Sequence, residues 1–139
     1  MIYSIYSPVS GIIISQVSDA NQIQNRPYVV GRYEPGQFYV KDRQIRPLPA
    51  RPPSQSQVSW RWNPAAQTWE YDQSKTDQNA RKIRETLFAE VDKVNPMWFE
   101  SMTAEQQQQV REYRQAIIDL TDQPGWPRDI TWPVKPAWL

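Results

Sequence analysis

The residue pattern changes at Ser74, and this change restricts the folds that the chain can adopt. Before Ser74, short runs rich in Ile, Val, Tyr and Trp are separated by Pro and turn residues, a pattern typical of short β-strands. After Ser74, apolar residues recur every three or four positions, which is typical of amphipathic helices. We therefore predict an α+β fold, with a small antiparallel, Pro-interrupted β-region over residues 1–73 and a helical hairpin with an extended C-terminal arm over residues 74–139.

The expected strands of the first region lie between recognisable turns. Residues 7–11 have the length and composition of a hairpin loop. Residues 34–36 read Glu-Pro-Gly, in which Pro presets one φ angle and Gly accepts a positive one. Residues 41–44 are expected to form another tight turn. The predicted strands are residues 1–6, 11–17, 28–32, 38–40 and 45–47.

A proline-rich connector follows over residues 47–53, with the sequence Pro-Leu-Pro-Ala-Arg-Pro-Pro. Such a run favours the stiff polyproline II conformation. It is either a spacer that crosses the sheet or a ligand for an aromatic groove, and we favour the spacer.

Residues 59–71 predict an aromatic hairpin, because one register satisfies three cross-strand pairs at once. It places the aromatic residues on one face of the hairpin and an opposite-charge pair on the other. Residues 63–68 supply the turn, with Pro at its second position. The predicted pairs are Trp62 with Trp69, Trp60 with Tyr71, and Arg61 with Glu70.

Two helices are expected after Ser74. The first is capped by Thr76 or Asp77 and ends at Asn95-Pro96, and residues 97–99 then form an apolar link. Thr103-x-x-Gln106 spells a capping box that starts the second helix, which stops at residues 123–125. The apolar stripes are Ala80, Ile83, Leu87, Val91 and Val94 on the first helix, and Val110, Tyr113, Ile117 and Leu120 on the second.

The last residues form an arm that displays aromatic rings at intervals. Trp126-Pro127 and Trp132-Pro133 repeat a Trp-Pro step, and each residue before a proline is driven toward extended conformations. We expect Trp126 to fold back on the helical hairpin. For Trp132 and Trp138, packing near Tyr113 and Ile117 and contact with a partner remain equally open.

Composition excludes several kinds of chemistry. The chain has no His and no Cys, so a Ser-His-Asp or Cys-His arrangement and a thiolate zinc site cannot form. The 15 acidic residues are scattered among 16 basic ones, as expected for a solvated surface. We therefore expect no catalytic residue, no cofactor and no bound metal.

Charge and hydropathy argue against two classes of partner. A net charge of +1 gives little attraction to nucleic acid or anionic lipid, so the Trp-Arg-Trp run of the hairpin is better explained by cross-strand pairing than by base stacking. No apolar segment reaches the ~18 residues of a membrane span, and residues 1–15 lack the basic region of a signal peptide. We expect neither nucleic acid nor membrane as a partner.

From Arg81 onward the chain resembles the tail fibre assembly proteins, or tail assembly chaperones, of tailed bacteriophages. Ile118 and Trp126 stand where this family usually has Arg and Phe, and Phe88 stands where it usually has a second Leu. The shared motifs cover about 55 residues, and their combination is specific. They are Arg81-x-x-Arg84 with Leu87 and Asp92, Met102-Thr103-x-x-Gln106, Tyr113 to Asp119, Gln123 to Pro127, and Ile130 to Pro136.

This resemblance implies a binding protein that promotes folding, trimerisation or attachment of the phage tail fibre protein in the cytoplasm of the infected bacterium. Other tail or baseplate proteins and a second copy of the chain are further candidate partners. The alternative is a permanent virion component, such as a fibre cap or connector. A tail-associated cell-wall hydrolase is a third and weaker reading.

The residues that we expect to contact a partner lie on the second helix and on the arm. They combine aromatic rings, which contribute most to protein interfaces, with the prolines that hold the arm extended. The set comprises Tyr113, Arg114, Ile117, Trp126, Trp132, Pro133, Pro136 and Trp138.

Overall fold

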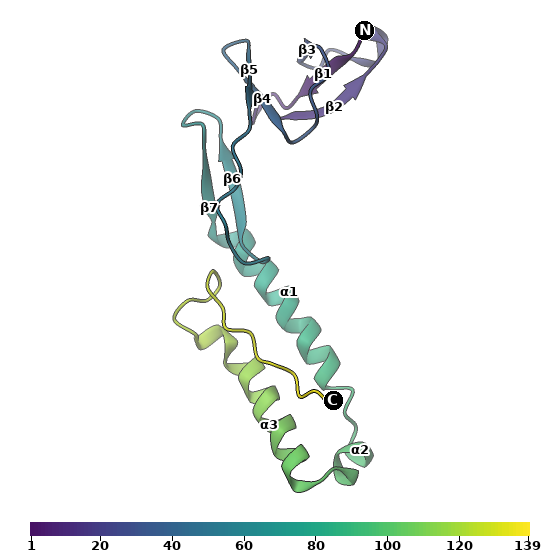
Figure 1. Ribbon diagram of the computed structural model, residues 1–139, viewed down its shortest axis with the longest axis vertical. Helices are drawn as coiled ribbons and strands as arrows, with labels where there is room; N and C mark the ends of the chain where they lie inside the picture. Colours follow the sequence, from purple (N-terminus) through teal and green to yellow (C-terminus); the bar gives the residue numbers. More distant parts are fainter. The chain divides into compact units, whose positions relative to one another are not determined.

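The computed structural model describes residues Met1–Leu139 and has the expected α+β composition, with short antiparallel strands followed by helices (Figure 1). The chain divides into two compact units. The β-unit contains Met1–Pro53 and Trp60–Glu70, and the helical unit contains Ser54–Ser59 and Tyr71–Leu139.

A three-stranded antiparallel sheet opens the β-unit. Its strands are β1 (Tyr3–Tyr6), β2 (Ile13–Val17) and β3 (Tyr28–Val30), with β1 in the centre. A short 3-10 helix, η1 (Ala20–Gln22), lies between β2 and β3. Ile5 and Ile13 are buried, and they form the apolar side of this small sheet. The strands predicted around residues 1–6, 11–17 and 28–32 are therefore confirmed.

The strands β4 (Phe38–Lys41) and β5 (Gln44–Pro47) form a second antiparallel hairpin. Its two turn residues, Asp42 and Arg43, both have positive φ angles, 52° and 64°. Positive φ at both central residues matches the right-handed twist of a two-residue hairpin. The tight turn predicted there is thus present, and it places Tyr39 in the interior with its ring 4.9 Å from that of Trp62.

The aromatic hairpin is formed by β6 (Ser59–Asn63) and β7 (Thr68–Asp72). The rings of Trp62 and Trp69 meet edge to face at 5.2 Å, as the predicted register requires. The same register brings Arg61 within 3.8 Å of Glu70. These two pairs are confirmed, and the pairing of Trp60 with Tyr71 stays a prediction.

The proline-rich connector lies against this hairpin. The indole Nε1 of Trp69 donates a hydrogen bond to the carbonyl oxygen of Pro49 at 2.8 Å, and the guanidinium of Arg51 lies 4.9 Å from the centre of the Trp69 ring. Prolines leave their carbonyl groups free to accept, so an indole N–H is a suitable partner for such a segment. The connector is therefore anchored on the β-unit.

The helical unit contains α1 (Gln73–Val91), α2 (Pro96–Ser101) and α3 (Ala104–Ile118), followed by the 3-10 helix η2 (Asp119–Asp122). The predicted cap of α1 was wrong, because the backbone N–H of Lys75 donates to the side chain of Asp72 at 3.0 Å. The apolar link predicted at residues 97–99 is instead the helix α2. The capping box at Thr103 and Gln106 is present as predicted.

A single apolar core joins α1, α2, α3 and the arm. It contains residues from both predicted stripes, together with Met102 between α2 and α3 and Ile130 from the arm. Leu87, Phe88, Val94, Phe99, Trp126, Trp132 and Leu139 pack around it. The fully buried members of this core are Ala80, Ile117 and Leu120; the others are Val91, Met102, Val110, Tyr113 and Ile130.

Candidate partner-binding surface

The arm begins with a compact loop rather than an extended segment. The side-chain amide of Gln123 donates to the carbonyl of Thr131 and accepts from its N–H, at 2.8 and 2.9 Å. Inside this closure, the carbonyl of Gly125 accepts from the backbone N–H groups of Arg128 and Asp129. The expectation of an extended arm from residue 126 was therefore wrong, because these hydrogen bonds turn the chain between Gln123 and Ile130.

Two glutamines of the segment Ser54–Ser59 hold this loop in place. Gln55 exchanges two hydrogen bonds of 2.9 Å with the backbone of Ile130. Gln57 is almost fully buried, and its amide donates to the carbonyl oxygens of Pro127 and Arg128. These bonds satisfy backbone groups that the irregular loop cannot pair within itself.

Trp126 folds back onto α1, as predicted. Its indole donates to Asp77 at 3.0 Å, and Arg81 donates to the same carboxylate at 2.8 Å while its guanidinium lies over the indole ring. The hydrogen bond from Arg81 is the main cause that lowers the pKa of Asp77; burial opposes it, and the bond from Trp126 adds to it. Asp77 therefore stays ionised and ties the loop to α1.

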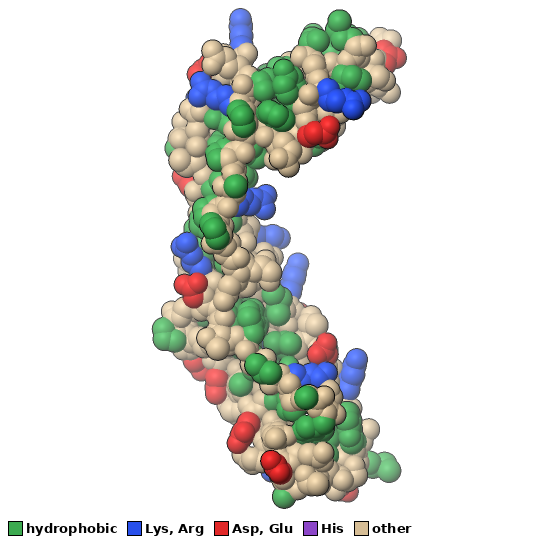
Figure 2. Space-filling view, in the orientation of Figure 1, with side chains coloured by type: hydrophobic (Ala, Val, Ile, Leu, Met, Phe, Trp, Pro, Cys, Tyr) green, Lys and Arg blue, Asp and Glu red, His purple; other side chains and the backbone are tan.

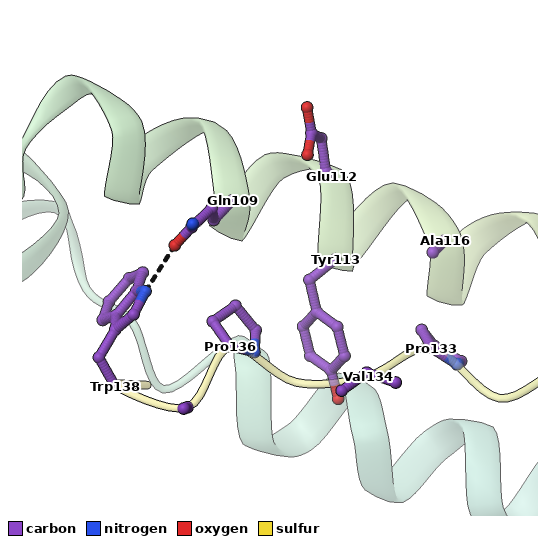
Figure 3. A pocket seen from close by; sticks show the side chains of 9 residues that line it. Gln109, Glu112, Tyr113, Ala116, Pro133, Val134, Pro136 and Trp138 are labelled. Carbon is purple, nitrogen blue, oxygen red and sulfur yellow. Dashed lines mark hydrogen bonds between the residues drawn. The ribbon is translucent and has the colours of Figure 1, made fainter.

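Beyond Thr131 the arm is extended and runs antiparallel to α3, so that Pro133 lies near Ala116 and Trp138 lies near Gln109 (Figure 3). A groove of ≈ 570 Å³ remains between the arm and α3. The indole of Trp138 donates to Oε1 of Gln109 at 2.6 Å at one end of this groove. The groove is lined by Gln109, Glu112, Tyr113, Ala116, Pro133, Val134, Pro136, Ala137 and Trp138.

A second hollow of ≈ 250 Å³ adjoins this groove where the arm ends. It lies between Trp98 of α2 and Leu139, and Tyr113 lines both hollows. Val134 is 89% exposed, Trp98 41% and Trp138 37%. Figure 2 shows hydrophobic side chains grouped over the helical unit with charged side chains around them. We name the set Trp98, Tyr113, Pro133, Val134, Pro136 and Trp138 the arm surface.

Tyr113 is the aromatic ring on which the arm rests. It projects from α3 toward the arm between Val134 and Pro136, and it is almost completely covered (Figure 3). Burial raises the pKa of the Tyr113 phenol, and the charge of Glu90 raises it further. The phenol is therefore neutral at physiological pH and serves as packing for the arm.

The structure brings together four of the eight residues predicted to contact a partner, namely Tyr113, Pro133, Pro136 and Trp138. Ile117 is fully buried in the core, and Trp126 and Trp132 pack against that core. Arg114 lies on the opposite side of α3 and donates to Asp92 at 3.0 Å. The side chains of the other four predicted residues therefore support the helical unit itself.

Sequence reasoning missed Trp98 and Val134 as part of this surface, and it missed Gln109 as the hydrogen-bond partner of Trp138. The sequence Asn95-Pro96 carried a usable signal, because Asn is a preferred helix cap and Pro is favoured at the first helical position. Asn95 does cap α2 by accepting from the backbone N–H of Trp98 at 2.8 Å. No such local signal existed for Val134 or Gln109, which meet only after the arm folds back on α3.

Two arginines of the sequence motifs fasten the helical hairpin. Arg84 of α1 donates to the carbonyl oxygens of Ile117 and Ile118 at the end of α3, both at 3.0 Å. A cation at a helix C-terminus is favourable, because the last carbonyl groups of the helix carry partial negative charge. Together with the pair Asp92–Arg114, these bonds tie α1 to α3.

Two further observations concern metal ligands and membrane-spanning helices. No three acidic side chains lie close enough together to hold a metal ion. None of the helices combines the length and the apolar character needed to cross a membrane.

Residues 77–137 match the family described as phage tail assembly chaperone protein. This match covers α1 from its second turn, all of α2 and α3, and the arm, which are the elements that carry the arm surface. The resemblance expected from the sequence motifs is confirmed. No curated protein matches the chain, and no solved structure does so.

Proposed function

We propose that this chain, whose residues 77–137 match the family described as phage tail assembly chaperone protein, promotes tail fibre assembly by binding the fibre protein. The family indicates a tail assembly chaperone with tail proteins as partners. The fibre protein as the specific partner, and the arm surface as the place where it binds, are our proposal.

The proposal rests on apolar side chains that stay exposed although the backbone that carries them is held in place. Val134 and Trp138 stay exposed although the arm carrying them is packed on α3. Exposed aromatic residues next to hollows are the usual anchors of protein interfaces. The Trp98 ring on α2 extends the same surface.

The mechanism is burial of apolar area without bond chemistry. Before it trimerises, a fibre chain exposes apolar surface that would otherwise aggregate. Covering that surface with Trp98, Val134 and Trp138 stabilises the complex by roughly 1–3 kcal/mol for each well-buried side chain. Release follows when trimer contacts replace those with the chaperone. We place this activity in the cytoplasm of the infected bacterium.

Co-expression tests the proposal. The phage tail fibre protein is produced alone, with this chain, and with a variant carrying Val134→Asp and Trp138→Ala. We expect the wild-type chain to increase the yield of folded fibre trimer and the variant to lose most of this increase. An equal trimer yield with and without the chain would overturn the proposed function.

Purified virions separate a chaperone from a permanent tail subunit, the other role that the resemblance allows. Quantitative mass spectrometry should find the fibre protein and no stoichiometric amount of this chain. A fixed ratio of the chain to the fibre protein would assign it to the finished tail.

A further inference from the structure

A second groove lies on the side of the helical hairpin that the arm leaves uncovered. It has a volume of ≈ 510 Å³ and is bounded by α1, α2 and α3. Its lining residues on α3 are Val110, Arg111 and Arg114, whereas Gln109, Glu112, Tyr113 and Ala116 line the groove beside the arm. At helical spacing these two sets lie on different sides of α3.

The floor of this groove is apolar. Val91 and Val110 are buried at its base, and the half-buried side chains of Val94 and Phe99 complete it. Such a floor accepts an apolar side chain from a partner and gains free energy by removing that side chain from water. We name this site the arginine groove, after the two guanidinium groups at its rim.

The two arginines at the rim differ in their partners. Arg114 donates to Asp92 at 3.0 Å, and its guanidinium lies 5.4 Å from the centre of the Phe88 ring. The Arg111 guanidinium lies 5.1 Å from the centre of the Phe99 ring and forms neither a hydrogen bond nor an ion pair. Arg111 therefore offers its N–H donors at the edge of an apolar groove.

A carboxylate is the group that satisfies such a guanidinium best, because two parallel N–H···O bonds fit the planar fork. The amide nitrogen of Asn95, on the same rim, is also free to donate, since its oxygen is used to cap α2. The groove thus fits a chain segment that presents an apolar side chain and, close after it, an acidic one.

Nucleic acid fits this groove less well. Stacked bases need an open ring face, and the Phe99 ring already carries the Arg111 guanidinium.

From these contacts we propose that the arginine groove binds an extended segment of the tail fibre protein in which an apolar residue is followed within two positions by Asp or Glu. The inference rests on the proposed function, which supplies the fibre protein as partner. It adds a second contact with its own side-chain preference, separate from the arm surface.

Overlapping peptides that cover the phage tail fibre protein, probed with the full-length chain, test this proposal. The variants are Arg111→Glu, Arg111→Gln and Arg111→Lys, with Lys82→Glu as control. Lys82 is exposed on α1 outside the groove, so Lys82→Glu makes the same change of net charge as Arg111→Glu. Thermal unfolding first checks that each variant folds like the wild type.

We expect the wild-type chain to bind peptides that share the apolar-acidic pattern. Arg111→Glu should weaken this binding at least about tenfold, and Lys82→Glu should leave it unchanged. Arg111→Lys should retain only part of the binding, because the ammonium group keeps the charge but lacks the planar fork. Replacing the acidic residue of a bound peptide by Ala should cause the same loss, and combining it with Arg111→Gln should add little.

Three results overturn the inference. One is equal peptide binding by the wild type and by Arg111→Glu. Another is a wild-type chain that binds the whole fibre protein but no peptide. The third is an Arg111→Glu variant that loses binding to a single-stranded oligonucleotide and not to the peptides. If the wild-type chain fails to bind the fibre protein at all, the proposed function itself falls.

Discussion

The guanidinium of Arg84 in α1 donates from Nε to the carbonyl oxygen of Ile117 in α3 across 3.0 Å, and it thereby joins the two long helices of the helical unit. Replacing Arg84 by Ala should lower the free energy of unfolding by about 1–2 kcal/mol, because the terminal carbonyls of α3 lose a charged donor. Arg84→Lys should recover only part of this loss. Urea unfolding followed by the helical circular dichroism signal measures it, with exposed Lys82→Ala as control. Equal stability of both Ala variants would contradict this role.

The Asp77 carboxylate predicts a pH dependence. Its pKa is lowered in the folded protein, mainly by the hydrogen bond from Arg81. A lowered folded pKa stabilises the fold above the ordinary value of 3.8, and this contribution is lost as the pH falls through the folded pKa. Asp77→Asn should therefore lose less stability than the wild type as the pH is lowered from neutral to below 3.8. Exposed Glu85→Gln serves as control, and parallel pH profiles of wild type and Asp77→Asn would refute the assignment.

Gly125 is required by close backbone contact. A Cβ atom at this position would lie 2.2 Å from the carbonyl oxygen of Asp129, an atom that cannot move without opening the loop. At Gly36 the space is open, and only its positive φ opposes a side chain. Gly125→Ala should cost about 2 kcal/mol or more in unfolding free energy, against about 1 kcal/mol for Gly36→Ala. Similar costs for the two variants would show that the loop adapts.

The connector of the β-unit should loosen when the Trp69 indole donor is removed. Trp69→Phe keeps an aromatic ring but removes the hydrogen bond to Pro49, so the backbone N–H of Leu48, which donates to the carbonyl of Gln37, should exchange its hydrogen faster. The expected loss of stability is about 1 kcal/mol. Trp98→Phe, on an exposed ring of the helical unit, is the matched control. Unchanged exchange in Trp69→Phe would mean that the connector is held by other contacts.

Much of the fold follows from local residue patterns. Alternating apolar runs and turn residues located the strands of the first two hairpins, because each turn there depends on neighbouring residues alone. The pairing of Trp62 with Trp69 followed from matching side chains across one turn. The capping box at Thr103 and Gln106 is likewise a contact within one helical turn.

The errors arose where side chains serve distant contacts. Thr76 and Asp77 have the residue types of helix caps, yet Thr76 accepts from the backbone N–H of Ser59 and Asp77 binds Trp126 and Arg81. The true cap is Asp72, the last residue of β7. The first turn of α1 after it contains no residue of the apolar stripe, so the sequence pattern did not point to Asp72. These roles depend on tertiary structure, which local patterns do not contain.

The candidate site was predictable only in part. The aromatic rings and prolines of the arm could be selected from their spacing, and packing of the arm near Tyr113 was one of two alternatives that the sequence left open. Which of them remain exposed depends on how deeply the arm packs. The arm packs with Trp132 against the core, and it leaves Trp138 at the surface.

Truncation of the arm is a weaker test of the arm surface than point substitution. Removing all residues after Gly125 also removes Ile130 and Trp132, which cover the core, so lost binding would be confounded with lost stability. Val134 and Trp138 lie on the exposed side and can be changed without opening the core.

The most direct test of the account is the affinity of the full-length chain for the phage tail fibre protein, measured by calorimetry. Val134→Asp combined with Trp138→Ala should weaken binding by about 2 kcal/mol, roughly thirtyfold in Kd. The matched control is Val9→Asp, since Val9 is 83% exposed on the β-unit and Val134 is 89% exposed on the arm. The account predicts wild-type affinity for Val9→Asp. Unchanged affinity for the arm variant, or an equal loss for Val9→Asp, would contradict the claim that the arm surface binds the fibre protein.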